Sequence, residues 1–407
     1  MTTKTAAYSY ANYDDPFWSL DSLEGVPDVQ TGTTVAPPKS TAIHDALTWV
    51  AGILPGFVLA LLLAWLGTLL ADLAGRLLHY DVGISPISPV TLAVALGLVV
   101  RNTIGVPKAY EPGLRLCVRA VLRIGIVIMG LTLSILTVGK DVVYALPVMV
   151  GCMASAMIFV SLLTRAMGLP RKLGTLIAVG TSICGVSAIM ATAPIIDADE
   201  NETSYAAACI TIFGLMAMIS YPFIGHQIFT SGHDAGMFFG TAIHDMSQAT
   251  GAGLAYAQQY KAEDAFHTAV SVKLVRNLFM SVLIPLAGIL YHRGSSSSKH
   301  VKQKWHQIVP LFVVGFLLMA CVRSLGDAGG AKAFGFIDKV NWDHVGSLAK
   351  FVVPWVLGMS MAAVGLGTGL AKLKNLGLKP FSVGFAAAVI VGLVSVTLIK
   401  VMGMLAH

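Results

Sequence analysis

Charged residues are scarce in this sequence of 407 residues. Asp, Glu, Lys and Arg make up 12% of it, whereas soluble globular domains carry about 25%. Hydrophobic residues account for 56%, and the mean hydropathy is +0.76. The low charge excludes a soluble globular protein. Because a helix satisfies its own backbone hydrogen bonds in lipid, we predict an all-α polytopic membrane protein.

Cysteine is scarce too, and it forms no pattern typical of a metal site or a disulfide framework. The five cysteines all lie in or beside apolar runs: Cys117, Cys152, Cys184, Cys209 and Cys321. The sequence also lacks a His-Glu-x-x-His motif and paired mid-membrane aspartates. We therefore expect no metal, no cofactor and no enzymatic activity.

The net charge of +6 does not indicate nucleic-acid binding, because the basic residues fall mostly between apolar segments. Lysine and arginine gather in the short loops on one side, as in cytoplasmic loops. These loop residues are Arg101, Lys108, Arg165, Arg171, Lys172, Arg293, Lys299, Lys302, Lys304, Lys372, Lys374 and Lys379. With eleven spans, this places the N-terminus in the cytoplasm and the C-terminus outside.

Residues 1–44 form a polar cytoplasmic tail with no features of a signal peptide, so we expect it to stay attached. It is either mobile or docked through its aromatic residues on the protein's own cytoplasmic face. Eleven apolar segments of spanning length follow it. They cover 49–71, 84–100, 115–137, 143–166, 173–196, 203–224, 235–257, 267–291, 307–323, 347–370 and 381–404.

The spans divide into one extra helix and two sets of five. The first helix and its loop cover 45–83, and the two sets cover 84–224 and 235–404. An odd number of spans per set forces the second set to be inverted. We therefore predict two inverted five-helix repeats whose fourth spans, 173–196 and 347–370, are broken and crossed, as in many transporters.

Span 173–196 has small and polar residues near its centre, where a spanning helix should be apolar. A break there would direct the N-terminus of the second half-helix at mid-membrane, which favours an anion. The alternative is a continuous helix whose small residues allow close packing. The predicted substrate ligands are Thr181, Ser182, Cys184, Gly185 and Ser187, with Gly358 and Ser360 from span 347–370.

Two neighbouring spans carry polar residues deep in the membrane, where such residues suggest function. Thr241, His244, Asp245 and Gln248 form one stripe on a helix over 235–257.

Span 267–291 carries Lys273, Arg276 and Asn277 at a similar depth to Asp245. Arg276 is the predicted charged substrate ligand, because a guanidinium donates several hydrogen bonds to an oxyanion. His244, Asp245 and Gln248 are predicted to serve coupling, with His244 carrying a proton and Asp245 orienting it. The alternative is a structural ion pair of Asp245 with Arg276 or Lys273. Lys273, Asn277 and the deep Arg123 are candidates for an anion path.

Four motifs resemble those of the bacterial sulfate exporter family. They are Gly180-Thr-Ser-Ile-Cys-Gly-Val-Ser-Ala-Ile189, Gly240-Thr-Ala-Ile-His-Asp245 with Gln248, Ser88-Pro89 leading to Gly97-Leu-Val-Val-Arg-Asn102, and Arg123-Ile-Gly-Ile-Val-Ile-Met-Gly130. The resemblance covers residues 45–404. It implies an inner-membrane transporter with a panel and a core, similar to sodium/proton antiporters and bile-acid symporters, and a sulfate-like substrate. It also implies a homodimer.

A departure from the related antiporters disfavours cation exchange. Those proteins carry acidic residues on the helix after the first broken one, where this chain has none between Tyr205 and Tyr221. We expect a secondary carrier that moves a small oxyanion by alternating access, with a proton or sodium as coupling ion. The alternatives are a sodium- or proton-coupled carrier of an organic anion, a cation exchanger of the same fold, and an anion channel.

Overall fold

The computed structural model describes residues 42–78, 87–292, 311–329, 332–334, 337–369 and 378–405. The described chain is α-helical apart from a two-stranded antiparallel ladder, β1 (Lys332–Ala333) with β2 (Ile337–Asp338). Six helices are long and apolar enough to cross a membrane, and the bent pair α11 and α12 makes a seventh. An all-α polytopic membrane protein is confirmed. The predicted tail, residues 1–44, lies almost wholly outside the described residues.

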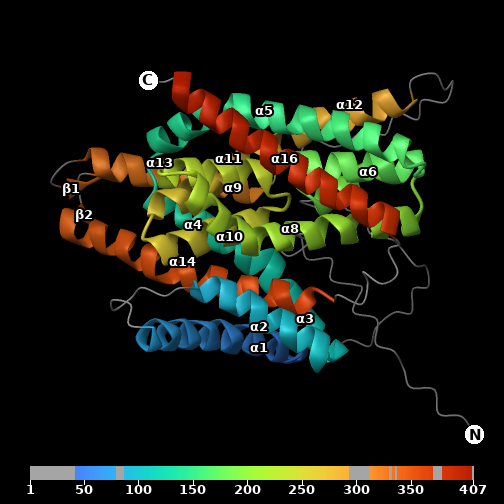
Figure 1. Cartoon of the computed structure of the whole chain (residues 1–407). Helices are drawn as coiled ribbons and strands as arrows, with labels where there is room; N and C mark the ends of the chain where they lie inside the picture. Colours follow the sequence, from blue (N-terminus) through green and yellow to red (C-terminus); the bar gives the residue numbers. More distant parts are fainter. Residues whose placement is uncertain are drawn as a thin grey trace, which may run out of the picture.

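Helices α1, α2 and α14 lie together in the lower part of the view in Figure 1, with α2 between α1 and α14, and they belong to one group of helices. It begins with α1 (Ala42–Leu77) and α2 (Pro89–Thr103). A segmented span follows: a 3-10 turn (Lys108–Tyr110), α3 (Glu111–Leu116), a π-helical turn (Cys117–Val121), α4 (Leu122–Met129) and a 3-10 turn (Gly130–Thr132). Later in the chain, α13 (Leu311–Ala328) packs on α4, and α14 (Lys339–Gly367) packs on α2 and α4. We call this group the panel.

The remaining helices form a second group, the core, which lies above α1, α2 and α14 in Figure 1. Its helices are α5 (Ile135–Ala166), α6 (Arg171–Ser182), α7 (Val186–Thr192), α8 (Glu200–Ile228), α9 (Gly232–Ala242), α10 (Met246–Tyr260), α11 (Glu263–Leu278), α12 (Met280–His292) and α16 (Leu378–Leu405). The long helices α5, α8 and α16 surround shorter ones. A capping box of Asp199 and Glu202 starts α8.

Large apolar side chains on the outer helices are exposed, among them Trp49, Leu62 and Trp65 on α1 and Leu393 on α16. Exposed apolar surface of this extent would be unfavourable in water. In a protein with several spanning helices, these side chains contact the lipid bilayer.

Two spans are broken, at 183–185 between α6 and α7 and at 243–245 between α9 and α10. The first break lies in span 173–196, where the sequence predicts it. The prediction of a second break in 347–370 is wrong, because α14 is one continuous helix through Gly358 and Ser360. A Cβ atom on Gly358 would meet only Ala64 at 3.9 Å, and the Ser360 hydroxyl donates to the carbonyl of Val356 within the same helix. The division into repeats at 84–224 and 235–404 was based on the number of spans and on breaks at matching positions. The second of these two arguments no longer holds, because only the first predicted break is present.

Close packing of α2 on α14 depends on two glycines. A Cβ atom on Gly365 would lie 2.3 Å from the carbonyl oxygen of Val94, and one on Gly97 would lie 2.5 Å from that of Ala362. A carbon atom cannot approach a carbonyl oxygen this closely, so both positions require glycine, which has no Cβ atom. The backbones of the two helices therefore touch, as in other small-residue helix contacts in membranes.

Replacing Gly365 with alanine should lower the stability of the folded protein by about 1–3 kcal/mol, because α2 and α14 would have to move apart. The measurement is the apparent melting temperature of the purified protein in detergent. Gly367→Ala, two residues further along α14, is the matched control, since its Cβ would meet no atom within 4 Å. Equal melting temperatures for the two variants would contradict the close contact.

Candidate functional site

The first break follows directly from the backbone of Gly185. This residue has φ of 74° and precedes the first residue of α7, a conformation that glycine adopts without the strain imposed by a Cβ atom. Its N–H donates to the carbonyl oxygen of Gly180 at 3.0 Å, which closes the end of α6. The chain therefore leaves helical geometry at 183–185 and restarts at Val186.

The second break ends in a capped helix. Ile243 and Asp245 have extended backbone, and Asp245 is the N-cap of α10. Its Oδ1 atom accepts hydrogen bonds from the backbone N–H and the hydroxyl of Ser247, at 2.8 and 2.5 Å. A carboxylate suits this position, because it satisfies a free N–H and faces the positive end of the helix dipole.

The two breaks meet. A Cβ atom on Gly185 would lie 3.5 Å from both Cα and Cβ of Asp245, which is ordinary van der Waals contact. The start of α7 and the start of α10 are therefore neighbours. Two half-helix ends are brought together from spans that lie more than fifty residues apart in the sequence.

Lys273 of α11 holds both breaks from one side. Its Nζ atom donates to the carbonyl oxygens of Ile183, Ile243 and His244, at 3.1, 2.6 and 2.5 Å. The side chain is fully buried. Since an ammonium group has three N–H donors, all of them are used on the two breaks.

Arg276, one turn further along α11, completes this arrangement. Its Nε and Nη2 atoms donate to Ser182 and Thr181 carbonyls at 2.9 and 2.6 Å. Its Nη1 atom donates to Thr241 and Ile243 carbonyls at 2.6 and 3.2 Å. Four of the five N–H groups of the guanidinium therefore bind the C-terminal ends of α6 and α9. The two cations lie at the negative ends of two helix dipoles.

These contacts revise two predictions. Within the described residues, Asp245 makes no ion pair with Arg276 or Lys273; it caps α10, and the cations bind carbonyls instead. Arg276 therefore acts first as a cap for two helices, and a single N–H is left for a substrate. The polar stripe from Thr241 to Gln248 is also interrupted, because the helix breaks between them.

Part of the breaks is accessible. Val186, Ser187 and Asp245 are partly exposed, while Thr181 to Gly185 and His244 are buried. The three accessible residues belong to the first turn of α7 and the N-cap of α10. We call these three residues the open side of the breaks, and the buried side chains of Lys273 and Arg276 the closed side.

Several buried polar atoms near the breaks and along α11 have no hydrogen-bond partner among the described residues. These are Thr181 Oγ1, both ring nitrogens of His244, Ser271 Oγ and Asn277 Oδ1. Buried polar atoms are normally paired. Unpaired ones of this kind suggest a place where water or a substrate supplies the missing partner.

Other predicted residues have local partners. The hydroxyl of Ser182 donates to the carbonyl of Ala178 at 2.6 Å, so it stays on its own helix. Gln248 donates to the carbonyl of Thr211 on α8 at 3.0 Å. The Cys184 thiol lies 3.1 Å from the sulfur of Met280.

Three predicted residues lie elsewhere. Ser360 bonds within its own helix, to Val356. Gly358 lines a separate cavity of about 130 Å³ between the panel and Gln258 of α10. Arg123 of α4 lies over the ring of Phe312, 5.7 Å from its centroid.

Asp141 was not selected from the sequence, because it lies in the first turns of a long apolar helix. The structure places it in the core, 9% exposed, with an oxygen 3.3 Å from Nε2 of His233 at the start of α9. Thr268 of α11 donates to its other oxygen at 3.4 Å. The three residues join α5, α9 and α11.

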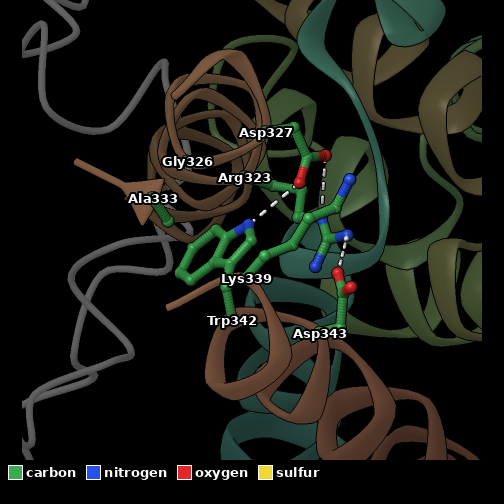
Figure 2. Close-up of a pocket in the computed structure, with 7 residues that line it drawn as sticks. All are labelled: Arg323, Gly326, Asp327, Ala333, Lys339, Trp342 and Asp343. Carbon is green, nitrogen blue, oxygen red and sulfur yellow. Dashed lines mark hydrogen bonds and ion pairs between the residues drawn. The ribbon is translucent and has the colours of Figure 1, made fainter. Parts of the chain in front are cut away.

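Another cavity, of about 260 Å³, lies between α13 and α14 beside the β-ladder (Figure 2). Arg323 is central to it: Nε lies 2.9 Å from Asp327, and Nη2 lies 3.7 Å from Asp343. Trp342 donates to Asp327 at 2.9 Å. These contacts of Arg323 and Trp342 with Asp327 and Asp343 tie the two panel helices α13 and α14 together.

Residues 55–384 match the family described as Conserved hypothetical protein 698, and the chain belongs to this family. A UPF0324 membrane protein of Nitratidesulfovibrio vulgaris is 30% identical over 73% of this chain and 79% of its own length. A second, of Fusobacterium nucleatum, is 28% identical over 78% and 91%. A third, of Agrobacterium fabrum, is 29% identical over 87% and 94%. All three relatives are named as membrane proteins, which agrees with the several spanning helices of this chain.

Arg276→Lys should destabilise the protein although it keeps the charge. A lysine has three donors and no planar fork, so at least one of the four carbonyls would lose its partner, at a cost of roughly 1–3 kcal/mol. The apparent melting temperature in detergent would report the change. Arg165→Lys, on the exposed end of α5, is the control. If both variants melt like the unchanged protein, the capping role is refuted.

Proposed function

We propose that this membrane protein is a secondary carrier that moves a small oxyanion across the bacterial inner membrane by alternating access. The substrate would bind on the open side of the two breaks, against the first turn of α7. Sulfate or a related sulfur oxyanion is the substrate class that the motif resemblance favours. The observation that carries the proposal is the meeting of two broken helices around two buried cations.

The charge balance favours an anion. Lys273 and Arg276 bring two positive charges into the membrane region, and Asp245 brings one negative charge. The dipole of each half-helix adds roughly +0.5 at its start and −0.5 at its end, which cancel overall. About one positive charge therefore remains uncompensated at the breaks. Because isolated charge is costly in this environment, an anionic ligand would be stabilised there.

The hydrogen-bond donors at the breaks also favour an anionic ligand. No side chain of the described residues caps the N-terminus of α7, so its first N–H groups lack a side-chain acceptor. Ser187 lies in the same turn and is partly exposed. Thr181 and His244 add buried polar atoms that have no partner among the described residues. Polar groups at helix breaks are typical of the substrate sites of carriers with discontinuous helices.

Cation exchange has less support. In the described part of α8 no carboxylate lies between Tyr205 and Tyr221, and Asp245 is the single carboxylate at the breaks. A sodium-coupled organic-anion carrier and an anion channel remain the alternative functions, and they differ from a proton-coupled carrier in their response to sodium and to a proton gradient.

The orientation and assembly belong to the same proposal. The basic loops place the N-terminus in the cytoplasm and the C-terminus outside. Figure 1 shows the C-terminal end of α16 at the same end of the bundle as β1 and β2, so the β-ladder would face the outside. A homodimer formed through the panel is expected from the fold that the motifs resemble.

Purified protein should be stabilised by one class of anion in a thermal-shift screen of sulfate, sulfite, thiosulfate, phosphate, chloride and sodium. Binding at about a hundred times Kd adds about 2.7 kcal/mol of stability. Ser187→Ala should weaken the affinity for that anion roughly tenfold or more, since a hydrogen bond to a charged group is worth about 1.5–3 kcal/mol.

Ser220→Ala is the matched control, because its hydroxyl bonds the carbonyl of Met216 within α8. Stabilisation by sodium alone would favour the sodium-coupled alternative. Equal anion affinities in the two variants would remove the substrate from the start of α7.

A further inference from the structure

We propose that the cavity between α13 and α14 binds the headgroup of a phospholipid that carries both a phosphate and a primary ammonium group, as phosphatidylethanolamine does. The cavity has a volume of about 260 Å³ and is the one drawn in Figure 2. It is separate from the two breaks, so the proposal does not depend on the function proposed above.

The cavity lies at the ends of two spanning helices. Its lining residues come from the last turns of α13, at 323–327, and the first turns of α14, at 339–343, with Ala333 of the β-ladder. Both helices are long and apolar enough to cross a membrane, so their ends lie near the level of the lipid headgroups. Leu325 and Val340, next to lining residues in the sequence, are 64% and 69% exposed. Because apolar side chains this exposed belong in lipid, the cavity borders on the bilayer.

Part of the lining already has a structural role. Asp327 accepts from Nε of Arg323 and from the indole N–H of Trp342, each at 2.9 Å, so both of its oxygens are used. The guanidinium carbon lies 5.5 Å from a ring centroid of Trp342. The indole also packs on Gly326, where a Cβ atom would lie 2.4 Å from it. These contacts hold the walls of the cavity in place without a ligand.

Two other charged residues of the lining have no close partner. Lys339 makes no hydrogen bond or ion pair with the residues that the structure describes. The carboxylate of Asp343 has one charged neighbour, Nη2 of Arg323 at 3.7 Å (Figure 2), which is beyond hydrogen-bonding distance. Lys339 and Asp343 are four residues apart on α14, where side chains on a helix are neighbours, yet they form no ion pair with each other. Both charges are therefore available to a ligand.

The position of Lys339 favours an anionic group on the ligand. It is the first residue of α14, where the helix dipole has its positive end and a cation is unfavourable. An anion beside Lys339 removes this electrostatic cost. Nη1 of Arg323 also makes no hydrogen bond among the described residues, so it adds free N–H donors. A phosphate suits these groups, because its oxygens accept several charge-assisted hydrogen bonds from lysine and arginine.

The acidic side of the lining selects the second group of the ligand. The lining holds two positive and two negative residues: Arg323, Lys339, Asp327 and Asp343. A purely anionic headgroup would meet the free carboxylate of Asp343, whereas a primary ammonium would donate hydrogen bonds to it. A quaternary ammonium has no N–H and binds to open aromatic faces, but the ring of Trp342 is already covered by the guanidinium. The lining therefore favours phosphatidylethanolamine over phosphatidylcholine and phosphatidylglycerol.

The test measures the apparent melting temperature of purified, delipidated full-length protein in detergent. Phosphatidylethanolamine, phosphatidylcholine and phosphatidylglycerol with the same acyl chains are added in turn, and a bound lipid raises the melting temperature by mass action. Phosphatidylethanolamine should give the largest increase. Soluble glycerophosphoethanolamine at the same concentration should give a smaller one, because it lacks the chains that contact the apolar surface beside the cavity.

Two substitutions separate the two ends of the headgroup. Lys339→Gln removes a phosphate contact, so it should weaken the binding of phosphatidylethanolamine and phosphatidylglycerol alike, by about tenfold. Asp343→Asn removes the charged acceptor of the ammonium, so it should abolish the preference for phosphatidylethanolamine over phosphatidylglycerol. Lys140→Gln on α5 and Asp72→Asn on α1 are charge-matched controls at exposed positions outside the cavity. They should bind all three lipids as the unchanged protein does.

The contrary results are equally specific. A larger increase with phosphatidylglycerol than with phosphatidylethanolamine in the unchanged protein would refute the zwitterionic headgroup. Equal increases with all three lipids, or cavity variants that behave like their controls, would refute the cavity as the site. If glycerophosphoethanolamine stabilises the protein as much as the intact lipid, the ligand is a free zwitterion and the lipid is refuted. The screen with inorganic anions tests the two breaks separately.

Discussion

The structure of the core depends on the binding of backbone carbonyls by Lys273 and Arg276. A helix that ends inside a membrane leaves carbonyl groups without partners, and lipid cannot supply any. Here α6 and α9 end at the same place, and the two cations from one face of α11 bind six of their terminal and linking carbonyls. Both breaks are therefore stable only in each other's presence and with α11 beside them.

This arrangement divides the centre of the protein into two sides with different roles. The side of α11 is closed, and its donors are almost all used. The other side exposes Ser187 and Asp245 at the starts of α7 and α10. The cations that stabilise the breaks, Lys273 and Arg276, are therefore different groups from the partly exposed residues that we propose for the substrate site. A ligand on the open side would be attracted by the cations and bound by other donors.

The panel and the core differ in how their helices meet. Two panel helices, α2 and α14, pack backbone to backbone through Gly97 and Gly365. The contact of the panel with the core includes Met361 of α14 against Gly251 of α10, where a flexible methionine side chain lies on a residue without a side chain.

The sequence by itself determined the membrane class, the apolar segments, the first break and the polar residues of the core, because hydropathy, glycine and buried charge are local properties. It selected Thr181, His244, Lys273 and Arg276, which are buried in the core, and Asp245, which is partly exposed. Only the tertiary structure decided which span holds the second break and what the cations bind. Glycines in 347–370 and polar residues in 235–257 are both compatible with a break, and the choice depends on a partner at the freed carbonyls. That partner, α11, is identified by packing in three dimensions.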